Sequence, residues 1–479
     1  MSPMPKFSSL HFGHLDATQE ASEEPELLKD GYYDYRQAVQ GILEGSAWLV
    51  LGPKGSGKSA VLESIRLNWE GRWNRFFTYW NLAGFPVHDV TKIPTGQSQG
   101  PSRTQAAWEF LLLLRVVETL DGDQSLSAPG TFATMTKALK SNGYLTSDWT
   151  AKVAKWSSTR FKFDAKVVGL EHQVEAETVT PLEISAYLRD QISRTATQNL
   201  HLIAIDGLDS FFFEAQDEWT SLAGLMQSVW TLNRALKEWG LPVSVVVAAR
   251  SDIFDMLPGP ELNKLKPHSV HLDWHANGIG AQNHLWKLLS KKVAVGKPEV
   301  TNVVSQYLNR DVVIGPHRNL AEFLLDNTRL LPRDLVALMG HLQRDYQGNG
   351  TVPEDNAKRA VQTYAEEYFV GEIFDNLAGV LEPGYARQVA SFKDALRTAP
   401  SRFFTFDYLT NELSGELDPI QVKALLKQMF ETGGIGIRNG SYTDFVFRKI
   451  SGAGFTTRYE FMLHDALTRA WHRPWKQSD

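Results

Sequence analysis

Three glycines, a lysine and a serine near residue 55 have the types and spacing of a phosphate-binding site. The run is Gly52-Pro53-Lys54-Gly55-Ser56-Gly57-Lys58-Ser59-Ala60, which fits G-x-x-x-x-G-K-[ST] at every defined position. Glycine lets the backbone turn its N–H groups inward, and a helix that opens at Lys58 adds the positive end of its dipole. We expect a nest for a polyphosphate, with Lys58 on the outer phosphates and the Ser59 hydroxyl on Mg²⁺.

Two aspartates follow an apolar run in the middle of the chain. Leu202-Ile203-Ala204-Ile205 precedes Asp206, and Asp209 comes soon after. Such a run suits a strand buried on both faces of a parallel sheet, and ligands bind at the carboxyl ends of these strands. We therefore expect Asp206 in the magnesium shell, opposite Ser59. Asp209 is a candidate to polarise the attacking water, and its alternative role is to cap a helix that begins near Phe211.

Two arginines are candidates to contact the terminal phosphate. Arg250 follows the apolar run 243–249, and Arg333 follows Pro332 at the start of a predicted helix. At these positions each arginine could register whether the terminal phosphate is present. The alternative for Arg250 is an ion pair with a surface acid, and for Arg333 an ion pair with Asp334 or a neighbouring acid.

The segments that must position these residues alternate between strands and helices. Apolar and aromatic runs predict strands at 48–51, 75–80, 202–206 and 243–250, and helical spacing of apolar residues predicts helices after Lys58 and over 108–120, 182–195 and 222–239. Strands that alternate with helices pair in parallel. The expected fold class is α/β, a P-loop NTPase parallel sheet flanked by helices, with a helical lid and a C-terminal winged helix.

The segment before the first strand contains Tyr33, Tyr35 and Arg36. In many nucleotide-binding ATPases this segment lies beside the base, so one of these side chains could stack on adenine. Packing in the core is the alternative that we favour. Residues 1–30, which are polar and acidic, are expected to form an arm that is at most partly ordered.

The distance between the glycine-rich loop and Asp206 predicts an insertion at about 90–180 in a core of 31–298. Within it, helices are expected at 132–139 and 149–156, and alternation predicts a hairpin at 161–176. A surface for a partner or subunit and a packing role are both open for this insertion. Residues 255–300 are expected to be rich in loops, with an edge strand near Val270. A helical lid is expected at 299–345 and a helical connector at 346–400.

The last unit, residues 401–479, has the element order of a winged helix. Helices are predicted at 404–413 and 419–430, and strands at 435–437, 445–447 and 459–463, the first two on either side of Asn439-Gly440. From Arg402 onward, ten basic residues stand against nine acids. A near-neutral unit lacks the charge of a free-standing DNA reader, so we favour contacts within the molecule or between subunits, and nucleic acid is not favoured as a partner.

Composition excludes several classes of function. The chain has 479 residues, a net charge of −6 and no cysteine, which excludes disulfides and thiolate chemistry. The charge balance gives no global reason to expect nucleic acid or an anionic membrane as a partner. No leader pattern or membrane-spanning apolar stretch is evident, so we expect a cytoplasmic protein.

The order of these motifs resembles the STAND branch of the AAA-type ATPases and related bacterial P-loop ATPases that end in a winged helix. The resemblance rests on the glycine-rich loop, the segment Ile205 to Asp209, the strand ending at Arg250 and the Pro332-Arg333 pair. It implies that Lys58 and Ser59 contact phosphate and metal, that Asp206 is the magnesium-side acid, and that Arg250 and Arg333 are sensors. Relatives often have Asp-Glu where this chain has Asp209-Ser210, so the catalytic base is open and turnover is expected to be slow.

The resemblance also implies ATP and Mg²⁺ as cofactors and an ATP/ADP switch that controls assembly into a homo-oligomer or contacts with a partner protein. A role in bacterial anti-phage defence is a further implication. The alternatives are a DNA-binding initiator or regulator that uses its winged helix, and a small-molecule or polynucleotide kinase. No run of sensing repeats follows the winged helix.

Overall fold

The computed structural model describes residues 4–93, 101–145, 149–158, 163–164, 178–179, 181–208, 216–274, 282–377, 380–381, 386–448 and 454–473. The chain divides into two compact units. The first unit comprises Met1–Tyr35, Pro53–Ser64 and Leu272–Asp479, and the second comprises Arg36–Gly52 and Ile65–His271. Residues 53–60 of the glycine-rich loop thus belong to the same unit as the lid and the winged helix, whereas Gly52 belongs to the second unit.

The second unit is built on a five-stranded sheet with the order β2-β5-β6-β1-β7. Its strands are β2 (Arg75–Asn81), β5 (Leu200–Asp206), β6 (Val243–Ala249), β1 (Leu49–Leu51) and β7 (Ser269–His271). Every neighbouring pair is parallel. The predicted α/β fold class with a parallel sheet is confirmed, and the strands arise where apolar runs were found.

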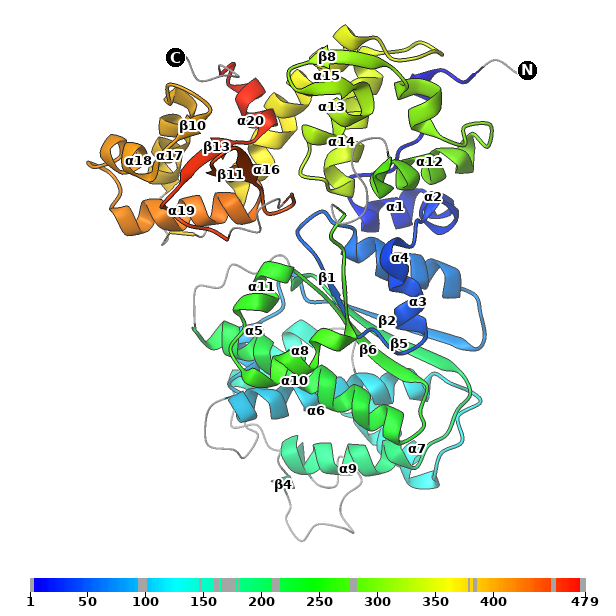
Figure 1. Cartoon of the computed structure of the whole chain (residues 1–479). Coiled ribbons are helices and arrows are strands. Elements are labelled where there is room, and N and C mark those ends of the chain that lie inside the picture. Colours follow the sequence, from blue (N-terminus) through cyan, green and yellow to red (C-terminus); the bar gives the residue numbers. More distant parts are fainter. Residues whose placement is uncertain are drawn as a thin grey trace. The chain divides into compact units, whose positions relative to one another are not determined.

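Helices cover both faces of this sheet (Figure 1). Ile203 and Val245 belong to the core cluster shared with α6 (Pro101–Asp121) and α10 (Gln216–Glu238). The alternate residue Leu202 lines one pocket together with Ile42 of α3 (Ala38–Leu43) and Trp69 of α4 (Lys58–Trp69). Burial on both faces explains why the strand sequences are continuously apolar.

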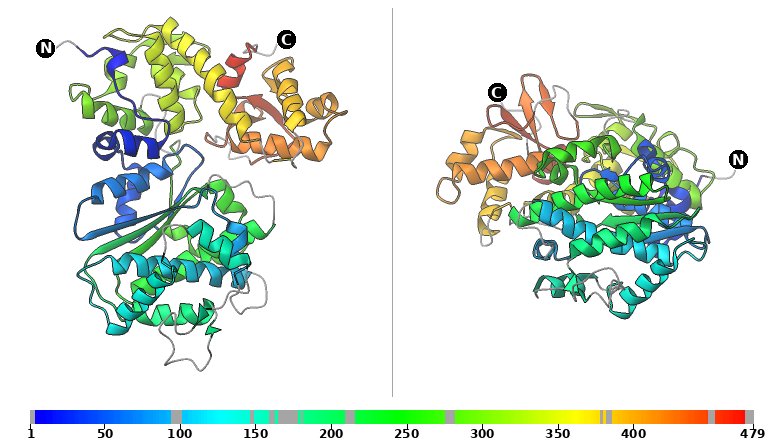
Figure 2. Two further views of the ribbon diagram at one scale, coloured as in Figure 1. Left: turned by 180° about the vertical axis from the view of Figure 1, so that it is seen from behind. Right: turned by 90° about the horizontal axis from the view of Figure 1, so that it is seen from below.

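The insertion extends the core on the α6 side. Within its expected bounds of about 90–180 it contains α6 itself, α7 (Gly130–Ser141) and α8 (Trp149–Ser158), and along the chain it is preceded by α5 (Val87–Val90) and followed by α9 (Pro181–Ser193). Trp149 and Trp156 belong to the same core cluster as the sheet. The described part of the insertion therefore packs on the core of the second unit, and Figure 2 shows its cyan helices grouped on one side of the sheet. Within the predicted hairpin at 161–176 the structure describes β3 (Phe163–Asp164), which pairs with β4 (Thr178–Val179) beyond the predicted end; the other residues of 161–176 lie outside the described residues.

The first unit begins with an ordered N-terminal segment rather than a partly ordered arm. It contains η1 (Phe7–Ser9), α1 (Ala17–Glu23) and α2 (Pro25–Gly31). Phe7 is fully buried against Tyr307 and Tyr346, and Glu20 forms a buried ion pair with Lys292. The expectation was wrong because the apolar residues here lack a regular period and are buried only by tertiary contacts.

Several helices precede the expected lid. They are η2 (Tyr35–Gln37) before the first strand, and α11 (Ser251–Met256), η4 (Pro260–Lys264), η5 (Lys266–His268) and α12 (His284–Gly296) after β6. The expected lid at 299–345 contains the π-helical turn η7 (Val304–Leu308), β8 (Asp311–Ile314), β9 (His317–Asn319), α13 (Leu320–Asp326) and α14 (Pro332–Asp345). The expectation that residues 255–300 are rich in loops was wrong for 284–296, which form α12. The Asn283 side chain caps the first turn of this helix. The predicted helix start at Pro332 is confirmed.

The connector and the winged helix complete the first unit. Their elements are α15 (Glu354–Tyr364), η8 (Ala365–Phe369), α16 (Val370–Asp375), α17 (Ala386–Thr398), β10 (Phe403–Phe404), α18 (Phe406–Glu412), α19 (Pro419–Glu431), β11 (Ile435–Asn439), β12 (Tyr442–Asp444), β13 (Glu460–Leu463) and α20 (Asp465–Ala470). The antiparallel sheet has the order β10-β13-β11-β12. The second wing strand begins at Tyr442 rather than Phe445, because Asn439 pairs directly with Tyr442 across a two-residue turn at Gly440.

Candidate nucleotide-binding site

The glycine-rich loop begins at the carboxyl end of the sheet. The Gly52 N–H donates to the Ala249 carbonyl, and the Ser251 N–H donates to the Gly52 carbonyl, both at 3.4 Å. Gly55 and Gly57 have φ values of +86° and +96°, which residues with a Cβ atom rarely adopt. The loop then enters α4 at Lys58, so the predicted strand, loop and helix order is confirmed.

The groups in this loop fit a polyphosphate. The Ser56 side chain is fully buried, and its Oγ has no hydrogen-bond partner among the described residues. Lys58 is 4% exposed, and its Nζ folds back to the Pro53 carbonyl at 3.1 Å, so a phosphate oxygen could take over this contact. The first N–H groups of α4 have no carbonyl in a preceding turn, which suits an anion. Lys54, Ser59 and Ala60 are partly exposed in the same loop.

Asp206 ends β5 at the same edge of the sheet as Gly52 and Arg250, because all three follow parallel strands. Its Oδ2 accepts a hydrogen bond from the Tyr79 hydroxyl at 2.9 Å, and its Oδ1 accepts the Gly207 N–H at 2.7 Å. Tyr79 was not identified from the sequence. Tyr79 and Asn81 are two positions apart in β2 and so lie on one face of the sheet, and Asn81 is the residue that pairs with Asp206. These two hydrogen bonds fix the orientation of the Asp206 carboxylate.

Arg250 is engaged by a neighbouring acid in this structure. Its Nε and Nη2 donate to the two carboxylate oxygens of Asp252 at 3.0 and 2.6 Å. Burial raises the pKa of Asp252, but the hydrogen bonds and charge of Arg250 more than offset this, so that pKa is lowered. The ion pair considered from the sequence thus exists. Asp209 lies outside the described residues.

Arg333 lies against the glycine-rich loop within the first unit. Its backbone N–H donates to the Gly55 carbonyl at 3.3 Å, and a Cβ placed on Gly55 would stand 3.2 Å from the Arg333 Cβ. The guanidinium Nε donates to the Leu15 carbonyl at 2.9 Å. Asp334 does not pair with Arg333, because its carboxylate takes Arg329. Arg333 and the loop are therefore neighbours in this structure, and the role of Arg333 as a sensor stays a prediction.

The aromatic residues before the first strand have packing roles. The Tyr35 ring is 2% exposed and stacks on Trp274 at 4.1 Å, and its hydroxyl donates to the Asp273 carbonyl. The Tyr33 hydroxyl pairs with His284 Nδ1 at 2.7 Å. Arg36 has a φ of +57°. Tyr35 therefore packs in the core, which is the role that we favour from the sequence.

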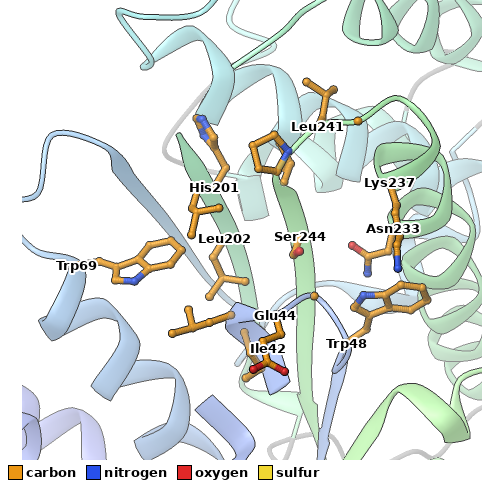
Figure 3. Close-up of a pocket in the computed structure, with 16 residues that line it drawn as sticks. Ile42, Glu44, Trp48, Trp69, His201, Leu202, Asn233, Lys237, Leu241 and Ser244 are labelled. Atoms are coloured by element: carbon orange, nitrogen blue, oxygen red, sulfur yellow. The ribbon is translucent and has the colours of Figure 1, made fainter. Parts of the chain in front are cut away.

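A pocket of about 350 Å³ lies at the amino ends of β5 and β6, at the opposite edge of the sheet from the site (Figure 3). Its lining side chains are held by other contacts. His201 is bonded to Asp123 and Thr119, and Trp48 stacks on His268 at 3.8 Å. This pocket is separate from the candidate nucleotide site.

No protein-family model matches the sequence, and no curated protein matches it. Among solved structures, the crystal structure of Cdc6p from Pyrobaculum aerophilum aligns over 93% of this chain and 97% of its own, with 10% identity and a TM-score of 0.32. Because that TM-score is low, the P-loop fold with a winged helix rests on the strand order and loop geometry above. In the described part of the chain, no helix is long and apolar enough to cross a membrane.

Proposed function

We propose that this chain binds ATP with Mg²⁺ and acts as a slowly hydrolysing molecular switch. The observation that carries this is the contact between the phosphate-binding loop and the lid. Arg333 touches Gly55, and the next residue, Asp334, is fully buried in an ion pair with Arg329. Of these two adjacent residues, one thus contacts the glycine-rich loop and the other packs inside the lid.

The proposed roles follow from the side chains. Lys58 and the loop N–H groups hold the outer phosphates, and Ser59 and Asp206 hold Mg²⁺, which would neutralise charge on the terminal phosphate. Asp209 would polarise the attacking water. Arg250 would leave Asp252 and bind the terminal phosphate instead. Arg333 would likewise leave the Leu15 carbonyl and bind the terminal phosphate. Catalysis would be mostly positioning and charge neutralisation.

The lid is joined to the winged helix through three consecutive residues, which supports a switch. Asp326 pairs with Arg448 at 2.9 Å, the Asn327 Oδ1 accepts from Arg469 at 3.0 Å, and the Thr328 carbonyl lies 3.2 Å from His464 Nε2. A shift of the Arg333 helix on nucleotide exchange would strain these contacts. We propose that the winged helix thereby changes its contacts with further copies of the chain or with a partner protein, as in STAND ATPases, and a setting in anti-phage defence stays a prediction.

The DNA-binding alternative has one observation in its favour. Lys423 and Lys427 are exposed on α19, where Ile420 is 79% exposed. Duplex binding that weakens with salt and is lost on changing both lysines to alanine would support this alternative. Duplex binding that is absent at low salt would exclude it.

Calorimetry with ATP and ADP in the presence of Mg²⁺ tests the nucleotide site. The parent protein should bind both, and Lys58→Ala should lose about a hundredfold in affinity, because charge-assisted bonds to phosphate are removed. Lys237→Ala, at the pocket on the opposite sheet edge, is the matched control and should bind as the parent does. A parent protein that binds neither nucleotide overturns the proposal.

Turnover and assembly are separate measurements. Asp209→Asn should bind ATP as the parent does and lose hydrolysis, and hydrolysis at the parent rate would remove Asp209 as the base. Light scattering should show a larger particle with a slowly hydrolysed ATP analogue and Mg²⁺ than with ADP. An unchanged mass would exclude nucleotide-driven self-assembly and leave a partner protein as the target of the switch.

A further inference from the structure

Trp274 makes a direct hydrogen bond to the phosphate-binding loop. It follows β7 by three residues, and its side chain is 3% exposed. The indole N–H donates to the backbone carbonyl of Ser56 at 2.8 Å, and this bond is buried. Both residues belong to the first unit, and they are 218 positions apart in the sequence.

The bond sets the orientation of one peptide group in the loop. In a trans peptide the carbonyl and the following N–H point in opposite directions, and no described peptide bond is cis. Because the Ser56 carbonyl is turned toward Trp274, the Gly57 N–H is directed away from it. Gly57 has a φ of +96°, which brings successive N–H groups of such a loop toward a common centre.

Trp274 is itself held rigidly. Its ring stacks on Tyr35 with a centroid distance of 4.1 Å and an interplanar angle of 13°. Its carbonyl accepts the Asn283 side-chain amide at 3.3 Å, and the same side chain caps α12. Because these contacts hold the indole in place, its hydrogen bond keeps the Ser56 carbonyl directed toward Trp274.

We propose that Trp274 is a positioning residue for the phosphate site, which holds the Ser56–Gly57 peptide so that the Gly57 N–H is presented to the bound phosphate. This inference rests on the proposed nucleotide-binding function and deepens it. Without the indole donor, the buried carbonyl would lose its partner and the peptide would turn to find another. The Gly57 N–H would turn with it.

The chain offers a matched control for this role. Trp286 in α12 is 2% exposed, and its indole Nε1 has no hydrogen-bond partner among the described residues. Trp274→Phe and Trp286→Phe therefore delete the same atoms from buried sites, but only the first deletes a bond to the loop.

The first experiment is calorimetry of the full chain with ATP, ADP and inorganic pyrophosphate in Mg²⁺. Trp274→Phe should lose about five- to tenfold in affinity for all three, because the phosphates and not the base are affected. Trp286→Phe should bind as the parent does. Equal affinities in Trp274→Phe and the parent, or an equal loss in Trp286→Phe, would overturn the role of Trp274 and leave ATP binding intact. A merely structural role would lower the melting temperature without changing the pyrophosphate affinity of the folded protein.

A second measurement needs no variant. Labelling with carbonyl-¹³C serine and ¹⁵N glycine selects the three Ser-Gly peptides, which are Ser56-Gly57, Ser414-Gly415 and Ser451-Gly452. Pyrophosphate should shift one amide proton of the three downfield. A parent protein that binds pyrophosphate by calorimetry but shifts none of these amides overturns the inference alone, whereas a parent that binds no phosphate compound overturns the proposed function and the inference with it.

Discussion

Arg329 and Asp334 form a buried ion pair across the turn that leads into α14. The two side chains are 5% and 0% exposed, and the Asp334 carboxylate accepts the Arg329 backbone N–H, Nε and Nη2 at 3.0, 2.8 and 2.6 Å. Burial lowers the pKa of Arg329, but the charge and hydrogen bonds of Asp334 more than offset this, so that pKa is raised. Between the partners, Leu330 has a φ of +55°, so the pair holds a turn that leucine rarely adopts.

Breaking this pair should destabilise the lid. We expect Asp334→Asn to lower the free energy of unfolding by up to about 3–5 kcal/mol, because buried Arg329 would lose its nearest counter-charge and keep the longer contact with Glu372, at 3.4 Å. Denaturant unfolding of Asp334→Asn and of the double variant Arg329→Met/Asp334→Leu checks this, since the double variant removes both buried charges of the pair and should recover part of the loss. A double variant less stable than Asp334→Asn would contradict this account.

Arg333→Ala should weaken discrimination between nucleotides. The backbone contact with Gly55 survives in alanine, so only the guanidinium is lost. We expect ATP affinity to fall about tenfold and ADP affinity to change less than about twofold, because only ATP has the terminal phosphate. Calorimetry with both nucleotides measures the ratio, and Arg344→Ala, in the last turn of the same helix, is the control. Equal discrimination in Arg333→Ala and the parent would remove the sensor role.

Tyr79→Phe should alter the magnesium requirement. The lost hydroxyl orients Asp206 through the 2.9 Å hydrogen bond, and outer-shell partners of metal ligands typically contribute about 10- to 100-fold in affinity. We expect the Mg²⁺ concentration at half-maximal ATP hydrolysis to rise by about tenfold. ADP binding without Mg²⁺ should stay unchanged. An unchanged Mg²⁺ midpoint would show that Asp206 is not a metal-side acid or needs no orientation.

His464 should make stability depend on pH. Burial lowers its pKa to about 4, and the side chain is 1% exposed at the lid contact with Thr328. Because the folded pKa lies below the unfolded value of about 6.5, the unfolded chain takes up a proton first as pH falls. The stabilisation is complete above about pH 6.5 and is lost toward pH 4, by about 3 kcal/mol in total. Urea unfolding from pH 7.5 to 4 measures the loss.

The control for that prediction is His464→Asn, which can still cap α20 but does not titrate. The parent His464 Nδ1 accepts the Ala466 N–H at 3.1 Å, a contact that protonation would oppose. The variant should show a shallower fall in stability over the same range. A fall of the same depth in both proteins would assign the pH dependence to other groups.

The elements that could be predicted from the sequence are those with local causes. The strands β5 and β6 follow from uninterrupted apolar runs, and the Gly52-to-Ser59 loop follows from a fixed spacing of residue types. The helix at Pro332 follows from its proline. In contrast, α12 was missed although Asn283 caps it, and the N-terminal helices were missed because their burial depends on partners such as Lys292.

The sequence by itself determined the parallel sheet, the phosphate-binding loop and the order of lid and winged helix, because each depends on interactions within a few residues. Only the tertiary structure decided which side chains support them. Tyr79 meets Asp206 across 127 positions, and Trp274 meets Ser56 across 218. Asp334 selects Arg329 over its neighbour Arg333, whose guanidinium turns instead to Leu15. Such pairs depend on how distant segments pack, and residue spacing along one chain does not encode that packing in a local pattern.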